Sequence, residues 1–207
     1  MVKESSVPEV VILRLPLYIR ALSQMSAEGK TVISSKSVGS RLQITPAQIR
    51  KDLSYFGRFG KQGRGYTVDS LIETLTNILG LDRRWNSCVV GVGRLGKAII
   101  NYPGFVPEGF KIISAFDNDV NKIGQSVNDI KILPMNMIRS TVEKHDIKIA
   151  ILAVPATSAQ NVITELVDTD IKAILNYAPI APKVPPTLIL RNIDPVLSLQ
   201  SMTYYLQ

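Results

Sequence analysis

Apolar positions in the first 80 residues recur every three to four residues, the period of an amphipathic α-helix. This period predicts four helices. In chain order they cover residues 8–28, residues 33–43, a segment that begins at Pro46, and residues 68–79. Pro16 should start or kink the first helix, and Gly29 should end it. Ser34 or Ser35 can cap the second helix.

The third helix has the clearest start. Thr45 suits the N-cap, Pro46 the first position and Gln48 the third, which predicts a capping box. One face carries Ile49, Leu53 and Phe56, and the opposite face shows small, basic and hydrogen-bonding groups that suit base edges and phosphates. These groups are Ala47, Lys51 and Ser54, with Gln48 and Arg50 on the flanks. The short link from the second helix predicts a helix-turn-helix.

Residues 57–66 combine four glycines with Arg58, Lys61 and Arg64. After a capped basic helix, this composition indicates a tight β-hairpin, the wing of a winged helix, whose tip could reach phosphate or the minor groove. A flexible basic loop between helices is the alternative.

From residue 87 onward the pattern changes to apolar strands that alternate with helices, after a linker expected over residues 80–86. Strands are predicted over 87–90, 110–116, 131–133, 147–154 and 171–175, and helices over 93–102, 135–144 and 157–167. Continuous apolar strands separated by helices imply a parallel sheet covered on both faces. Residues 194–207 predict a terminal helix whose apolar surface suits docking against another subunit.

The first of these strands ends in Gly91-Val92-Gly93-Arg94-Leu95-Gly96, a G-x-G-x-x-G motif. Such glycines allow a tight turn, a close approach to a pyrophosphate and close helix–strand packing, and the phosphates would lie at the helix N-terminus. Asp117, 21 residues beyond Gly96, could accept from both ribose hydroxyls and repel a 2′-phosphate, which favours NAD(H) over NADP(H). A turn-forming Asp is the alternative. The prolines that follow the later strands either mark the ligand edge of the sheet or simply end those strands.

Charge separates the two halves of the 207-residue chain. Residues 1–84 hold 13 Lys/Arg and 7 Asp/Glu, whereas residues 85–207 hold 11 and 10. Seven basic residues in 36–64 are opposed only by Asp52, which points to a polyanion such as nucleic acid, with a solvated basic surface as the alternative. One Cys, no apolar run long enough to span a membrane and no signal peptide lead us to expect a cytoplasmic protein.

Catalytic groups are scarce in this pattern. His145, the only histidine, falls at a predicted helix end and is expected at the surface, and Cys88 is expected inside the first strand. No spacing of metal ligands is evident. We therefore interpret the nucleotide as a signal rather than a reagent, against two alternatives: an NAD-dependent dehydrogenase with a basic accessory domain, and a structural dimer stabilised by NAD.

Several longer segments resemble the bacterial Rex family of redox-sensing transcriptional repressors, over nearly the whole chain. The segments are RLPLYIRAL (14–22), SS (34–35), TPAQIRKDLSYFG (45–57), GKQGRGY (60–66), GVGRLGKAIINYPGF (91–105), AFDND (115–119), AVPA (153–156), ILNYAP (174–179) and NID (192–194).

The resemblance implies a homodimer built from a winged-helix domain (1–84), a Rossmann domain (85–192) and a terminal helix (193–207) that swaps into the partner. It implies an inverted-repeat operator that is bound in the presence of NAD⁺ and released by NADH. It also implies roles for Arg94, Tyr102 and Asp194 around the nicotinamide, and for Arg20 in coupling the domains.

Motifs and resemblance together define the expected sites. The expected nucleotide contacts are Gly91, Val92, Gly93, Arg94, Leu95, Gly96, Tyr102, Asp117, Val154, Pro155, Asn176, Tyr177 and Asp194. The expected DNA contacts are Ser35, Thr45, Ala47, Gln48, Arg50, Lys51, Ser54, Arg58, Lys61 and Arg64.

Overall fold

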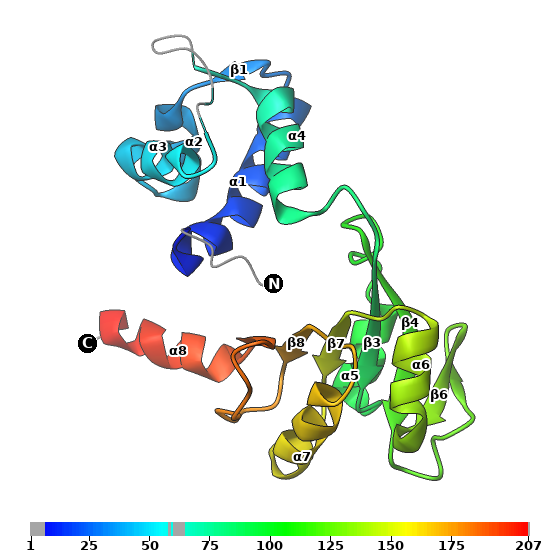
Figure 1. Cartoon of the computed structure of the whole chain (residues 1–207). Helices are drawn as coiled ribbons and strands as arrows, with labels where there is room; N and C mark the ends of the chain where they lie inside the picture. Colours follow the sequence, from blue (N-terminus) through cyan, green and yellow to red (C-terminus); the bar gives the residue numbers. More distant parts are fainter. Residues whose placement is uncertain (1–6, 58, 60–64, 207) are drawn as a thin grey trace. The chain divides into compact units, whose positions relative to one another are not determined.

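A computed structural model describes residues 7–57, 59 and 65–206 of the chain (Figure 1). The chain divides into two compact units, Met1–Arg83 and Arg84–Gln207. Each unit has its own apolar core.

Helices dominate the first unit. Its elements are α1 (Glu9–Ala27), β1 (Val32–Ile33), α2 (Ser35–Leu42), α3 (Pro46–Ser54), β2 (Tyr66–Thr67) and α4 (Val68–Leu79). Helices α1 and α4 pack against each other, as do α2 and α3. Leu15 and Leu22 of α1 and Leu75 of α4 are completely buried in the shared core.

Helix caps explain where α2 and α3 begin. The Ser34 hydroxyl accepts from the backbone N–H of Ser37, and the Ser37 hydroxyl accepts from that of Ser34, which is a complete capping box. Thr45 accepts from the N–H of Gln48, as predicted. The predicted capping box of α3 is wrong in its second half, because the Gln48 side chain donates to Asp52 instead of returning to the N-cap.

Two further expectations for this unit need correction. Pro16 does not start α1, which begins at Glu9 and runs through it. Pro16 is exposed, and the buried residues on either side keep the helix in place despite the missing N–H. The strand that contains Tyr66 pairs antiparallel with β1, with Tyr66 opposite Ile33, a partner strand that the periodicity did not predict.

Seven strands form the sheet of the second unit, in the order β5-β6-β4-β3-β7-β8-β9. They are β3 (Trp85–Val90), β4 (Phe110–Asp117), β5 (Ser126–Val127), β6 (Ile130–Pro134), β7 (Ile149–Leu152), β8 (Ala173–Asn176) and β9 (Ile189–Asn192). All pairs are parallel except β5 with β6. The parallel strands follow the order 3-2-1-4-5-6 of a Rossmann fold.

Helices cover both faces of this sheet. The covering elements are α5 (Arg94–Asn101), a 3₁₀ turn η1 (Met135–Met137), α6 (Ile138–Lys144) and α7 (Ala156–Val167). The chain then ends in α8 (Pro195–Thr203) and a 3₁₀ turn η2 (Tyr204–Leu206), neither of which contributes a buried residue. Cys88 and Val90 of β3 pack with α6 and α7, whereas Val89 between them packs with α5. This alternation places successive β3 side chains in two separate cores.

Sequence periodicity misplaced several strand limits. Trp85 and Asn86 belong to β3 and not to a linker. Strands β5 and β9 were not predicted, because they are short and lie at the sheet edges, where burial is partial. Ile189 of β9, for example, is 58% exposed.

Helix α8 differs from the other helices. None of its nine residues, all of which the structure describes, is buried. Val196, Leu197, Leu199 and Met202 are each more than half exposed, and Tyr204, Tyr205 and Leu206 of η2 even more so. The predicted excess of apolar surface on this terminal segment is confirmed. Across the described ranges, no helix has the length and hydropathy to cross a membrane.

Candidate nucleotide site and DNA-binding surface

The glycine motif forms the turn between β3 and α5. Gly91 has φ +93°, and a Cβ there would lie 2.6 Å from the carbonyl oxygen of Ala153. A Cβ on Gly96 would collide with the carbonyl oxygen of Gly91, so Gly96 lets α5 approach the turn closely. A Cβ on Gly93 would meet open space. The motif therefore combines two packing glycines with one that leaves the turn accessible.

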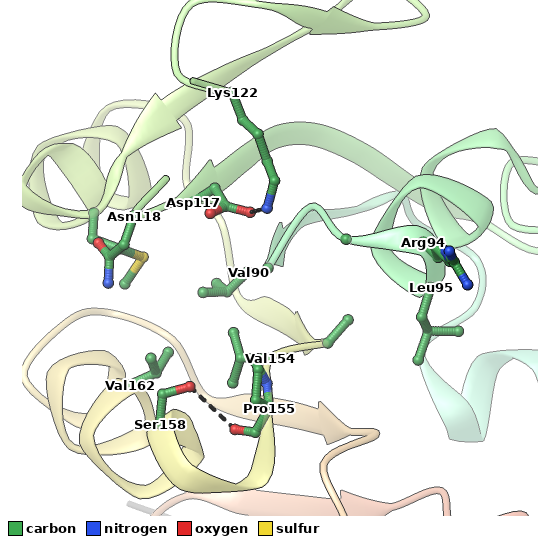
Figure 2. Close-up of a pocket in the computed structure, with 14 residues that line it drawn as sticks. Val90, Arg94, Leu95, Asp117, Asn118, Lys122, Val154, Pro155, Ser158 and Val162 are labelled. Atoms are coloured by element: carbon green, nitrogen blue, oxygen red, sulfur yellow. Dashed lines mark hydrogen bonds and ion pairs between the residues drawn. The ribbon is translucent and has the colours of Figure 1, made fainter. Parts of the chain in front are cut away.

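A cavity of 490 Å³ lies beside this turn, at the carboxyl ends of β3, β4 and β7. This is the sheet edge where ligands bind in Rossmann folds. Its lining residues are Val90, Gly91, Gly93, Arg94, Leu95, Asp117, Asn118, Lys122, Met135, Ala153, Val154, Pro155, Ser158 and Val162. Figure 2 shows Arg94 and Leu95 at one end of the cavity and Asn118 at the other.

Asp117 is the only carboxylate in this lining. Its Oδ2 accepts from the N–H of Val92 (2.8 Å) and from Lys122 Nζ (3.0 Å), and its Oδ1 accepts from the N–H of Asp119 (2.9 Å). Burial alone would raise the pKa of Asp117, but these donors outweigh it and lower the pKa below its ordinary value. The carboxylate is therefore ionised at neutral pH and is tied to the glycine turn.

The rest of the cavity combines apolar walls with positive groups. Val90, Val154 and Val162 are apolar, and the Ser158 hydroxyl donates to the carbonyl of Pro155 at 3.1 Å (Figure 2). Arg94 is the first residue of α5, where free N–H groups and the helix dipole favour an anion. Flat apolar rings and phosphates are thus both suited to this cavity.

The cavity brings together seven of the predicted nucleotide contacts: Gly91, Gly93, Arg94, Leu95, Asp117, Val154 and Pro155. Val92 is fully buried and presents its N–H to Asp117, and Gly96 acts through packing. The other four predicted contacts, Tyr102, Asn176, Tyr177 and Asp194, do not line the cavity.

Two of these four lie elsewhere on the unit: Tyr102 is exposed and Asp194 is half-buried. Tyr102 is 59% exposed, packs edge-to-face on Phe105 with 5.2 Å between ring centroids, and lines a different cavity of 500 Å³. Asp194 is the N-cap of α8, and its Oδ1 accepts from the N–H of Val196 at 2.9 Å.

Asn176 has a structural environment. It is fully buried, its Oδ1 accepts from the N–H of Ala178, and its Nδ2 donates to the carbonyl of Ala178 and to Oδ1 of Asn192. These bonds join the ends of β8 and β9 and fix the turn that contains half-buried Tyr177.

Sequence reasoning missed several lining residues, among them Asn118, Lys122, Met135, Ser158 and Val162. Two of these had a usable signal. Lys122 follows Asp117 by five residues in the turn after β4, and Ser158 lies in the first turn of α7. The apolar members could not be distinguished from core residues.

In the first unit, α2 and α3 meet through a tight turn. Gln43 ends α2 in the left-handed region (φ 55°), and a Cβ on Gly39 would collide with the carbonyl oxygen of Ile44. This close approach confirms the short link expected of a helix-turn-helix.

The outer side of α3 carries the predicted DNA contacts. Ala47, Arg50, Lys51 and Ser54 are exposed. The Arg50 guanidinium donates to the hydroxyl of half-buried Ser35 at 3.0 Å, so these two predicted contacts are joined. The hydroxyls of Thr45 and Ser54 are used within the helix itself, as N-cap acceptor and as donor to the carbonyl of Lys51.

The inner flank of α3 is fixed to α1 by a buried carboxylate. Asp52 Oδ2 accepts from Arg14 Nε (2.6 Å) and Tyr18 Oη (2.5 Å), and Oδ1 accepts from Arg14 Nη2 (2.8 Å) and Gln48 Nε2 (2.6 Å). Burial alone would raise the pKa of Asp52, but the three donors hold it below its ordinary value. Gln48, predicted to face DNA, therefore points to Asp52.

Other predicted residues behave as follows. Arg20 of α1 is exposed. Arg58, Lys61 and Arg64 of the predicted wing lie outside the described residues. His145 is exposed at the end of α6, as expected.

Cys88 is fully buried in β3, as expected, and burial raises the pKa of its thiol to about 12. Within residues 7–57, 59 and 65–206, no group of three or more His, Cys, Asp or Glu side chains could hold a metal ion.

Comparisons with known proteins match both units. A family model described as a CoA binding domain matches residues 82–180, and one described as the N-terminus of a putative DNA-binding protein matches residues 6–54. A crystal structure of RSP, a Rex-family repressor, in complex with β-NAD⁺ and operator DNA superposes with a TM-score of 0.93 at 38% identity, covering 98% of this chain and 94% of that one. RSP in complex with β-NADH gives a TM-score of 0.88 at 36% identity, with coverage of 98% and 95%.

Curated relatives agree with the structural neighbours. The redox-sensing transcriptional repressor Rex of Chloroflexus aurantiacus is 51% identical over 199 residues, 96% of this chain and 94% of the relative. Rex of Chloroflexus aggregans is 49% identical over 206 residues, 100% of this chain and 97% of the relative. The chain therefore belongs to the Rex family of redox-sensing transcriptional repressors.

Proposed function

We propose that this chain is a transcriptional repressor that binds an inverted-repeat operator as a homodimer and is released from it by NADH. The observation that carries the proposal is the combination of a basic helix-turn-helix with a Rossmann cavity in one chain. Support comes from the likeness to a repressor crystallised with both β-NAD⁺ and operator DNA. Acting on DNA, it would work in the cytoplasm.

The cavity suits a nicotinamide dinucleotide. The open space beside Gly93 and the N-terminus of α5 would receive the pyrophosphate. Ionised Asp117, at the end of β4, is placed to meet ribose hydroxyls once its present donors rearrange. Apolar walls such as Val154 would cover the flat rings. The nicotinamide itself supplies a positive charge when oxidised and none when reduced.

Arg94 is the residue in the cavity best suited to sense this charge. Its guanidinium at the end of the cavity would disfavour a cationic ring and accept a neutral one. Exposed Tyr102 and half-buried Asp194 lie outside the cavity, and we propose that they act where two subunits meet. Arg20, exposed on α1, is proposed to couple the domains.

On the DNA side, α3 would enter the major groove. Ala47 permits close approach, Lys51 and Arg50 can meet guanine or phosphate, and Ser54 can contribute a hydroxyl. We propose supporting contacts from Ser35 and Thr45 beside the helix, and phosphate contacts from the wing residues Arg58, Lys61 and Arg64.

Dimerisation would use α8. Its exposed apolar residues need a surface that its own unit does not provide, and a partner subunit could offer one by exchange of this helix. Such a dimer would present two α3 helices to half-sites separated by about one helical turn, 10–10.5 base pairs, or multiples of it. Moving the dimer from 99% operator-competent to 1% requires about 5.5 kcal/mol of ligand preference for the other state.

The test uses fluorescently labelled duplex DNA selected by the wild-type protein from a randomised library. Fluorescence anisotropy is measured during titration with NADH, NAD⁺ and NADPH. NADH should release the DNA, and NAD⁺ should not. Equal binding under saturating NADH and NAD⁺ would rule out the sensor. Consumption of NADH in the presence of small carbonyl compounds would indicate a dehydrogenase instead.

A further inference from the structure

We infer that Asp52 is a positioning residue for DNA reading, and that it sets the orientation of α3 by fixing this helix to α1. The inference rests on the proposed DNA-binding function. It concerns a residue on the inner flank of α3, turned away from the side that would meet the bases.

The geometry of the contact fixes direction as well as distance. Two guanidinium nitrogens of Arg14 meet the two oxygens of Asp52, so the planes of the two groups are held together. Tyr18, one turn further along α1, binds Oδ2, and Gln48, one turn earlier on α3, binds Oδ1. The three bonds from α1 thus leave α3 little freedom to roll or slide on α1, and the bond from Gln48 within α3 holds the carboxylate in place.

Stability alone does not account for this choice of residues. Asp52 lies in the last turn of α3, where the helix dipole disfavours a negative charge, and its side chain is fully buried. A well-packed apolar side chain at such a place is often as stable as a buried ion pair. Apolar contacts are non-directional, however, whereas a forked ion pair specifies an orientation.

The same contact also keeps the outer side of α3 basic. Asp52 is the only acidic residue in 36–64, and its charge is neutralised internally by Arg14. Arg50 and Lys51, its neighbours in the sequence, remain exposed. Because α1 supplies both Arg14 and Tyr18, a displacement of α1 would carry α3 with it.

The experiment compares three variants of the full chain: Arg14→Lys, Tyr18→Phe and Leu75→Ala. Arg14→Lys keeps the charge but loses the fork, and Tyr18→Phe removes only the hydroxyl. Leu75→Ala is the control, since it removes buried volume from α4 and no polar group. Affinity is measured for the selected operator and for a scrambled duplex, at a temperature where circular dichroism shows every variant folded.

Arg14→Lys should weaken operator binding by about tenfold, because contacts to base edges depend on the orientation of α3 in the groove. Binding to scrambled DNA should change little, because it depends on phosphate contacts. Tyr18→Phe should lower the ratio of operator to scrambled affinity by about two- to threefold, since it loses one hydrogen bond. Leu75→Ala should leave this ratio unchanged.

An unchanged ratio in both Arg14→Lys and Tyr18→Phe would overturn the inference, whatever their melting temperatures. Should Arg14→Lys not fold, Tyr18→Phe alone decides. A wild-type chain that selects no DNA from the library would refute the proposed function and this inference with it. Operator binding by the wild type with unaffected variants refutes the inference alone.

Discussion

Asp52 in the first unit and Asp117 in the second are both held by several donors, and both have lowered pKa values. Their surroundings differ. The Asp52 side chain is 0% exposed and its donors are all side chains, three of the four bonds coming from α1. The Asp117 side chain is 11% exposed at a cavity, and two of its three donors are backbone N–H groups close to it in the fold.

This difference separates a fixed carboxylate from an exchangeable one. Asp52 cannot lose Arg14 without leaving a buried charge uncompensated, so its role is to hold two helices together. Asp117 can give up Lys122 to solvent and accept a ligand hydroxyl in its place. Similar shifts in pKa therefore do not by themselves identify a binding site.

The strongest test of the comparison removes one cation from each site. Arg14→Met leaves Asp52 buried without its counter-charge and should lower the free energy of unfolding by about 3–5 kcal/mol. Lys122→Met should cost about 0–1 kcal/mol, because this pair is partly exposed. Urea unfolding followed by circular dichroism measures both, and equal losses would contradict the distinction.

Nucleotide binding should respond to one carboxylate only. Asp117→Asn weakens acceptance from ribose hydroxyls and should reduce NADH affinity by about tenfold, as expected for loss of a hydrogen bond to a charged group. Asp52→Asn, in the other unit, should leave NADH affinity unchanged. Isothermal titration calorimetry gives both values, and a loss in Asp52→Asn alone would reverse the assignment.

The free energy of unfolding should fall at acid pH as Asp52 and Asp117 become protonated. Each pKa is lowered in the folded state, so the stabilisation is complete above the ordinary value of 3.8 and is lost as the pH falls through the folded-state pKa. At acid pH, each group adds at most about 1.4 kcal/mol per pH unit to the slope of the free energy of unfolding against pH. Trp85, the only tryptophan, reports on the second unit by fluorescence.

When unfolding is followed by Trp85 fluorescence, Asp117→Asn should reduce the loss of stability at low pH, and Asp52→Asn should not. The far-ultraviolet circular dichroism, which includes the first-unit helices, should respond to Asp52→Asn. If Asp52→Asn also reduced the loss of stability at low pH as measured by fluorescence, the two units would not unfold independently of each other.

The smallest expected effect concerns coenzyme choice. Lys122 partly neutralises Asp117, so its removal should strengthen repulsion of a 2′-phosphate. Lys122→Met should raise the preference for NADH over NADPH by up to about fivefold, the scale of an exposed ion pair. Competition binding measures the preference, with Lys97→Met as control, since Lys97 is an exposed cation on the same unit that does not line the cavity. A fall in the preference would mean that Lys122 itself meets the ribose.

Much of this fold is visible in the sequence because local rules determine it. The caps at Ser34 and Thr45 and the turn glycines at 91 and 96 act within a few residues. Long apolar runs such as 147–154 also stand out, since the strand within this run, β7, is buried on both faces. Edge strands β5 and β9 do not, because their stability comes from pairing with a neighbour that local pattern cannot identify.

Contacts across long sequence separations were the least predictable. Nothing near Asp52 indicates that Arg14, 38 residues earlier, will pair with it, and so an apparent surface charge proved to be buried. Gln48 was assigned to the DNA side because the burial of its partner Asp52, four residues further along the same helix, depends on that distant pairing. Asp117 was easier, because its distance from the glycine motif is set by one strand–helix–strand unit.

Helix α8 has a consequence for how much of the protein must be present before it works. A segment with no buried residue gains little from folding on its own, so in the proposed dimer the order of α8 would depend on a second copy of the chain. The melting temperature should then rise with protein concentration by mass action. A cell that changes the number of copies would thus alter the assembly, and not merely the abundance, of this protein.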